Sequence, residues 1–131
     1  AGQQRDLAAG FVCRCESLAP LLAEQAAEAE QLRRLPEATL EAARSTGLFD
    51  AVVPASLGGQ GLGLDALAHG TRAMAHGCPA SAWTLSFFML HGWMLSKLPA
   101  AGRDEVFANG VPLLPVPLAR TGNLTEVHGG S

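Results

Sequence analysis

The chain has 131 residues, of which 48% are hydrophobic and 16% charged, and its formal net charge is −3. This length supports one domain with a single modest core rather than two domains. The composition excludes an intrinsically disordered chain, and the acidic balance argues against a nucleic-acid-binding protein, which would carry a basic face.

The charged residues are unevenly distributed along the chain. Residues 1–46 carry 12 of the 21 charged side chains, whereas residues 47–98 carry four. A stretch so poor in charge must be largely covered in the folded protein, and a domain of this size cannot easily cover it. We therefore expect residues 47–98 to pack against other subunits or against further polypeptide.

Helices are predicted for most of the chain. Residues from about 4 to 33 are rich in strong helix formers, and Pro20 inside this run predicts a kink or a break. A second helix opens with Pro36 in its first turn and ends at Gly47. A glycine-rich loop follows, after which Asp65 is expected to start and cap a third helix.

The third helix is expected to extend to about His76 and to stop at Gly77. Pro79 then opens a fourth helix that reaches about Leu98. Pro99 opens a short fifth helix, which is predicted to end at residues 109–110.

The pattern changes after residue 110. Residues 111–131 contain three prolines and no helical periodicity, which predicts a strand, a turn at residues 121–123 and a second strand through Val127. The predicted fold class is therefore mainly α, with a helical domain over residues 1–110 and the start of a β domain over residues 111–131. We expect the sequence to be the front part of a longer protein.

The three cysteines favour a reducing compartment, and we expect the protein to be cytoplasmic. Cys13 and Cys15 are too close in sequence for an ordinary disulfide, and Cys78 leaves an odd number. The Cys13-x-Cys15 pair has no second ligand pair nearby, which argues against a zinc site.

The predicted fourth helix, residues 80–98, is apolar enough to be considered as a membrane span. It also contains serine, threonine, histidine and lysine, and no neighbouring segment is of membrane type. We therefore favour a buried helix in a water-soluble helical assembly, with no membrane partner.

Polar residues of this helix share one stripe. At about 100° per residue, the stripe spans an arc of roughly 80° and comprises Ser81, Thr84, Phe88, His91 and Leu95. A buried polar group without a partner costs about 1–3 kcal/mol, so the stripe must meet polar partners, water or a ligand. Either His91 is hydrogen-bonded in the core, or it lines a pocket where it donates a hydrogen bond or shuttles a proton.

Two other features carry a weaker chemical signal. Residues 61–66 match the loosest dinucleotide-binding fingerprint, but only a short apolar run precedes them and Trp83 stands where the ribose-binding acid would be expected. A surface turn is the favoured interpretation. Arg33 and Arg34 could bind a phosphate, although a solvated helix end is the more common reason for such a pair.

Three segments of the sequence carry a resemblance to a known family. They are RRLPEATLEAARSTGLFDAVVPASLGGQGLGLDAL, AMAHGCPASAWTLSFFMLHGWMLSKLP and LLPVPLARTG, within residues 18–130. They resemble the N-terminal part of the acyl-CoA dehydrogenase superfamily. CPASAWTLSF followed by His91 and Trp93 is closest to the two-component, reduced-flavin-dependent monooxygenases, such as 4-hydroxyphenylacetate, steroid-phenol and dibenzothiophene oxygenases. The dehydrogenase hallmark, Thr-Glu-Pro followed by Gly-Ser-Asp, is absent.

The resemblance implies an N-terminal helical domain, a central β domain and a C-terminal four-helix bundle, usually in a homotetramer. It implies reduced flavin (FMN or FAD), supplied by a separate flavin reductase, and O₂ for the oxygenation of a small, largely apolar organic substrate. This chain alone would then be inactive. The flavin-binding residues are not assigned.

The resemblance also implies roles for individual residues. His91 matches a histidine that faces the substrate near the flavin, and is the candidate catalytic residue. Pro115 and Pro117 stand on the strand where relatives often offer serine to the substrate, which suggests a different or more apolar substrate because proline has no donor. The candidate substrate-binding residues are Ser81, Trp83, Thr84, Phe88 and Pro117.

Two alternatives remain open at this point. One is an acyl-CoA dehydrogenase-like enzyme with bound FAD, which would be recognised by a C-terminal glutamate base and a CoA-binding surface. The other is a non-catalytic helical interaction module, whose apolar helices would pack on a partner.

Overall fold

A computed structural model describes residues 2–115, 122–123, 125–126 and 128–129. The described part of the chain is helical, which confirms the predicted helical domain. Its elements are α1 (Gly2–Glu24), α2 (Ala26–Leu32), α3 (Glu37–Ser45), a 3₁₀ turn η1 (Ala55–Leu57), α4 (Leu64–Ala75), α5 (Pro79–Leu95) and α6 (Ala100–Phe107).

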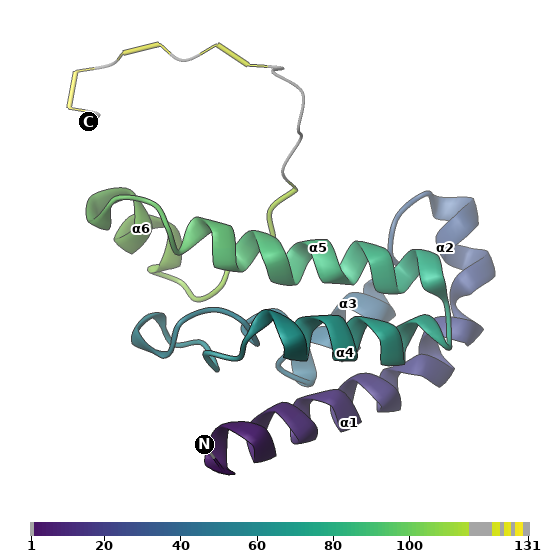
Figure 1. The fold of residues 1–131 in the computed structure, drawn as a ribbon. Coiled ribbons are helices and arrows are strands. Elements are labelled where there is room, and N and C mark those ends of the chain that lie inside the picture. Colours follow the sequence, from purple (N-terminus) through teal and green to yellow (C-terminus); the bar gives the residue numbers. More distant parts are fainter. Residues whose placement is uncertain (1, 116–121, 124, 127, 130–131) are drawn as a thin grey trace.

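Three long helices form the body of the fold. Helix α4 lies between α1 and α5 and packs against both, and α3 packs against α1 (Figure 1). The largest fully buried side chains come from all of these layers and from the loop after α3; they include Phe11, Leu22, Leu48, Met74, Leu85 and Met89. One core therefore joins the three helices.

Two glycines of the α4 region allow α1 to approach closely. A Cβ atom at Gly70 would lie 2.6 Å from Cε1 of Phe11, and one at Gly77 would overlap the carbonyl oxygen of Ala19. These glycines stand seven residues apart, which is two helical turns. Gly77 therefore ends α4 as predicted and also provides space for the backbone of α1.

Several predicted helix boundaries are confirmed and others shift. Gly47 has the left-handed φ of +68° expected after α3, and α5 begins at Pro79. Pro36 is not inside α3 but immediately precedes it, with an extended ψ of 151°. Asp65 lies in the first turn of α4 without capping it, because the helix begins one residue earlier and Gly63 occupies the cap position. The predicted cap is therefore wrong.

The long first helix is interrupted later than the proline suggested. Helix α1 continues past Pro20 to Glu24, and the interruption falls at Gln25. Pro20 is exposed, so water can solvate the carbonyl group that its missing N–H leaves unpaired. The prediction of a break at Pro20 itself is therefore wrong.

No strand occurs in the described part of residues 111–129. The predicted strands fall largely on residues 116–121, 124 and 127, which lie outside the described residues. The boundary at residue 110 and the β domain after it stay predictions.

Helix α5 is apolar around its whole circumference, and part of it is not covered. Trp83 is 66% exposed, Phe87 36% and Met94 42%. A helix that is hydrophobic on every side is normally buried. Residues 47–98, which carry few charges, thus include apolar surface on α5 that the described residues do not cover. Among the described helices, none is long and apolar enough to cross a bilayer.

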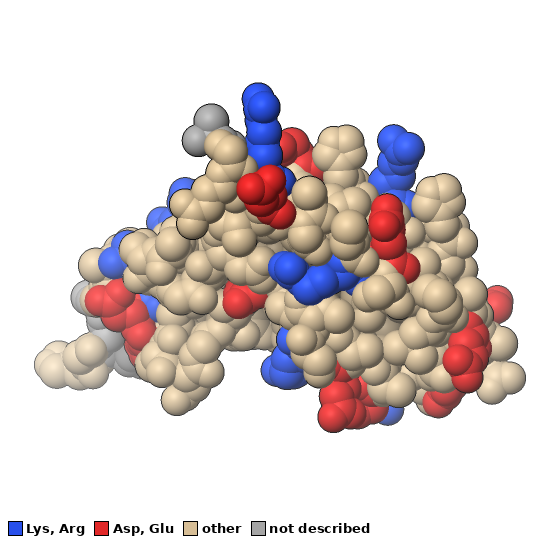
Figure 2. Space-filling model, turned by 90° about the horizontal axis from the view of Figure 1, so that it is seen from below, with Lys and Arg blue, Asp and Glu red and all other residues tan. Residues whose placement is uncertain are grey.

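The face seen from below carries charges of both signs. Figure 2 shows acidic and basic side chains interspersed over a largely uncharged surface, without an extended patch of one sign. This face therefore lacks the basic stripe that nucleic-acid binding requires.

Candidate functional site

A row of three rings runs along the exposed side of α5. The rings of Trp83 and Phe87 have centroids 5.1 Å apart, and those of Phe87 and His91 are 5.7 Å apart. The residues follow one another at intervals of four, which places them on successive turns. Exposure falls along the row from Trp83 to His91, which is 8% exposed. The row therefore leads from solvent to the histidine.

The geometry of His91 fixes the roles of its two nitrogens. Nδ1 lies 2.7 Å from the carbonyl oxygen of Leu114. A carbonyl can only accept a hydrogen bond, so Nδ1 carries a proton and donates it, and in the neutral form of the ring Nε2 is then the acceptor. The tautomer is assigned from this contact.

The other ring nitrogen of His91, Nε2, has no hydrogen-bond partner among the described residues. When the ring is neutral, this nitrogen can accept a hydrogen bond from a hydroxyl group.

The other residues of the predicted stripe lie in different surroundings. Phe88 packs edge-on against Phe49, with centroids 6.1 Å apart, and contributes to the core. Ser81 and Thr84 line a pocket against α2 that does not include His91. Thr84 donates its hydroxyl to the carbonyl of Ala80 at 3.1 Å. Pro117 lies outside the described residues.

The loop before α4 is held by a side-chain network that the sequence did not reveal. Nε2 of Gln60 donates to the carbonyl oxygen of Gly47 at 2.7 Å and to Oδ1 of Asp50 at 2.9 Å. Its Oε1 accepts from Nη2 of Arg14 at 2.8 Å, and Nε of Arg14 donates to the carbonyl of Thr46 at 2.9 Å. In the sequence, the only sign of this network is Gln60, a single glutamine among glycines.

This network gives the glycine-rich loop a structural role. The loop is tied to α1 through Arg14 and packs close to α5. A Cβ atom at Gly92 would lie 3.1 Å from Cγ2 of Val53 and 3.4 Å from the carbonyl oxygen of Phe49. The loop thus supports α5 one residue from His91, and it does not form a phosphate cradle.

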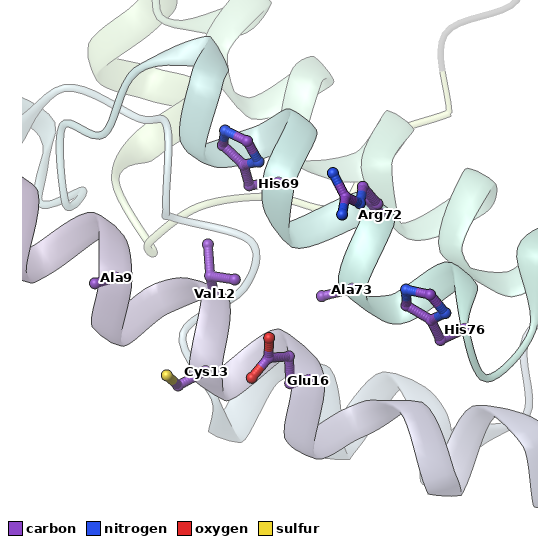
Figure 3. A pocket seen from close by; sticks show the side chains of 8 residues that line it. All are labelled: Ala9, Val12, Cys13, Glu16, His69, Arg72, Ala73 and His76. Atoms are coloured by element: carbon purple, nitrogen blue, oxygen red, sulfur yellow. The ribbon is translucent and has the colours of Figure 1, made fainter.

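A separate groove of about 570 Å³ lies between α1 and α4. Figure 3 shows its side chains: His69 and Arg72 come from α4, His76 directly follows that helix, and Cys13 and Glu16 come from α1. Although these residue types include metal ligands, no three histidine, cysteine or acidic side chains converge on one point within the described residues. We assign no catalytic role to this groove.

Comparison with known proteins defines the class of the chain. Residues 6–109 match the N-terminal domain of acyl-CoA dehydrogenases. Because this match covers most of the sequence, the chain belongs to that family, which confirms the superfamily resemblance.

The similar curated proteins are oxygenases. The chain is 30% identical over 96 residues to the flavin-dependent monooxygenase oxygenase subunit HsaA of Rhodococcus jostii (strain RHA1), covering 73% of the chain and 25% of that protein. It is 29% identical over 97 residues to the FADH(2)-dependent resorcinol hydroxylase oxygenase component of Rhizobium sp. (strain MTP-10005), covering 74% and 24%.

A third relative is similar over more of the chain. This is the oxygenase component of p-hydroxyphenylacetate 3-hydroxylase of Acinetobacter baumannii, 27% identical over 118 residues, which covers 89% of the chain and 28% of that protein. The chain spans about a quarter of the length of these relatives. No solved structure matches it significantly.

Proposed function

We propose that the chain is the N-terminal helical part of the oxygenase component of a two-component flavin-dependent monooxygenase, and that α5 forms one wall of its substrate site. The observation that carries the proposal is the row of rings ending at His91, whose Nε2 has no hydrogen-bond partner among the described residues. The similarity to three oxygenase components supports the reaction class.

The residues of this wall have separate tasks. The hydrogen bond to Leu114 holds the His91 ring in one tautomer and orientation. Nε2 then accepts the hydroxyl proton of a bound phenol or a related substrate, which orients it and helps to remove that proton. Trp83 and Phe87 pack against a planar apolar ring and exclude water from it.

Reduced flavin, when bound, supplies the activation of O₂ and the transfer of one oxygen atom to the substrate. The exposed apolar rings of α5 fit a flat aromatic group, and His91 fits a hydroxyl on it. We assign no residue of this chain to the flavin phosphate, and we leave FMN and FAD as alternatives.

The proposal extends to the assembly. A separate reductase supplies the reduced flavin, and the protein works as a homotetramer in the reducing environment of the cytoplasm. Residues 111–131 begin the following β domain. The uncovered apolar surface of α5 supports this arrangement, since further protein would bury it.

The test distinguishes the roles of the two ring nitrogens of His91, and it uses the complete oxygenase that contains this chain. In His91→Asn, the amide nitrogen can replace Nδ1 as the donor to Leu114, but nothing replaces Nε2. We expect product formed per reduced flavin consumed to fall about tenfold or more, with hydrogen peroxide formed instead. His91→Ala removes both groups, and His69→Ala, on exposed α4 surface, is the control and should keep wild-type coupling.

Unchanged coupling in His91→Asn would contradict the role of Nε2. Equal thermal stability of His91→Asn and wild type, together with loss of coupling, would exclude a purely structural role. A tightly bound oxidised FAD that removes hydrogen from an acyl thioester would instead indicate the dehydrogenase alternative.

A further inference from the structure

A second pocket opens at the other end of α5, against α2. Its volume is about 710 Å³. Figure 1 shows α2 beside the amino-terminal end of α5. Alanines of α2, together with Leu35 and Ala80, give the pocket apolar walls. It lies about two turns of α5 from His91 and is independent of the proposed substrate site.

The charged groups that line this pocket are Arg33, Arg34 and Glu30. Within the described residues neither guanidinium group has a hydrogen-bond or ion-pair partner, the one ion pair there being Arg103–Asp104. The positive side chains therefore outnumber the negative one, and the donors of both arginines remain available.

The backbone of Arg33 is unusual. Its φ of 54° is the only positive φ of a non-glycine residue among the described positions. This residue ends α2 in the left-handed conformation, where glycine or asparagine is usually preferred. An arginine in an unfavourable conformation beside a cavity suggests that its side chain is needed there.

One hydroxyl group of the pocket is already engaged, because Thr84 donates its hydroxyl to the carbonyl of Ala80. The charged donors of the pocket are the two guanidinium groups, which bind carboxylate and phosphate oxygens in pairs. The apolar walls would cover the rest of a ligand that carries such a group.

We propose that this pocket binds a small organic anion, a carboxylate or phosphate group on a compact apolar body, and that Arg33 and Arg34 hold its charged group. The ligand is distinct from the substrate proposed for His91, because the two sites share no lining residue.

Cys78 provides a reporter inside the pocket. Hydrogen bonding from the Ser81 hydroxyl, assisted by the first N–H groups of α5, lowers the pKa of the Cys78 thiol despite its partial burial. Cys13 is exposed on α1 outside this pocket, whereas burial raises the pKa of Cys15 to about 12. Iodoacetamide should therefore label Cys78 and Cys13 but not Cys15 in the folded chain.

The experiment measures the rate of iodoacetamide labelling at each cysteine by mass spectrometry. Sodium benzoate and sodium phosphate are added separately, with sodium chloride at equal ionic strength as the reference. We expect one or both anions to slow the labelling of Cys78 saturably and to leave Cys13 unchanged. Protection by benzoate alone indicates a carboxylate ligand, and protection by phosphate alone indicates a phosphoryl ligand.

The variant Arg33→Gly combined with Arg34→Ala removes both guanidinium groups. Glycine suits the positive φ of position 33, so the fold should be retained, which thermal melting checks. In this variant, the anion concentration that gives half of the maximal protection of Cys78 should rise about tenfold or more. The control is Arg5→Ala, which removes a positive charge from the exposed surface of α1, outside the pocket. It should leave the protection of Cys78 unchanged.

Three results would overturn the proposal. One is the absence of protection by either anion at roughly 10 mM, a concentration above the millimolar Kd expected for such a contact. Another is full protection in the double arginine variant. The third is protection by chloride equal to that by benzoate or phosphate.

Discussion

The loop from Gly47 to Gly63 and helix α5 lie against each other, but they are stabilised in different ways. The loop is held by polar contacts within the chain: Gln60 contacts Gly47 and Asp50 in the loop and Arg14 of α1. Helix α5 has no comparable polar network, and it leaves large side chains such as Trp83 exposed. The loop is thus complete within the chain, whereas α5 offers surface to something else.

This difference separates two kinds of feature in the sequence. The glycine-rich loop resembles a ligand-binding motif but serves to position α5. Helix α5 resembles an ordinary core helix but carries the exposed rings of Trp83 and Phe87 and the ring of His91. In this chain the functional surface therefore lies on the regular element, and the loop supports it.

The largest effect within the loop is expected from filling the space inside it. A Cβ atom at Gly59 would overlap the carbonyl oxygen of Val53, a backbone atom that cannot move freely. We expect Gly59→Ala to lower the free energy of unfolding by about 3 kcal/mol. The matched control is Gly102→Ala in α6, where nothing lies within 4 Å and a gain of about 0.5–1 kcal/mol is expected. Urea denaturation of both variants tests this, and equal stabilities would contradict the packing.

A smaller effect is expected from removing the polar network. Gln60→Ala and Arg14→Ala should each lower the free energy of unfolding by about 1–2 kcal/mol, because each leaves partly buried partners unpaired. The double variant should be more stable than the sum of the single effects predicts, by roughly 0.5 kcal/mol or more. Strict additivity in this double-mutant cycle would show that the loop does not depend on the contact between these side chains.

The smallest effect on stability is expected on the exposed row of α5. Trp83→Ser should change the free energy of unfolding of this chain by no more than about 0.5 kcal/mol, because the side chain is mostly in solvent. Leu85→Ala, two residues along but fully buried, should cost about 2–5 kcal/mol. Thermal and urea unfolding of the two variants provide the comparison. A large loss in Trp83→Ser would mean that the ring is part of the core.

Local sequence signals were sufficient for some of the helix ends. Pro79 and Gly47 mark helix ends through their own backbone preferences, so their positions did not depend on the rest of the fold. The predicted cap at Asp65 was wrong because Gly63, which has no side chain, occupies the cap position and α4 begins at Leu64.

The site required information that sequence periodicity does not contain. The stripe on α5 grouped Ser81 with His91 by helical angle, but α2 packs beside Ser81 and the segment at Leu114 returns beside His91. The pairing of Arg14 with Gln60 joins positions 46 residues apart. Such contacts follow from how the elements pack, and only the structure shows them.

The most direct test of the central claim is a crystal structure of the complete oxygenase with a phenolic substrate bound. We predict that Nε2 of His91 lies about 3 Å from the substrate oxygen, with Nδ1 still donating to Leu114 and the ring of Phe87 against the ligand. A substrate bound elsewhere, with Nε2 of His91 covered by protein, would contradict the assignment of α5 as a wall of the active site.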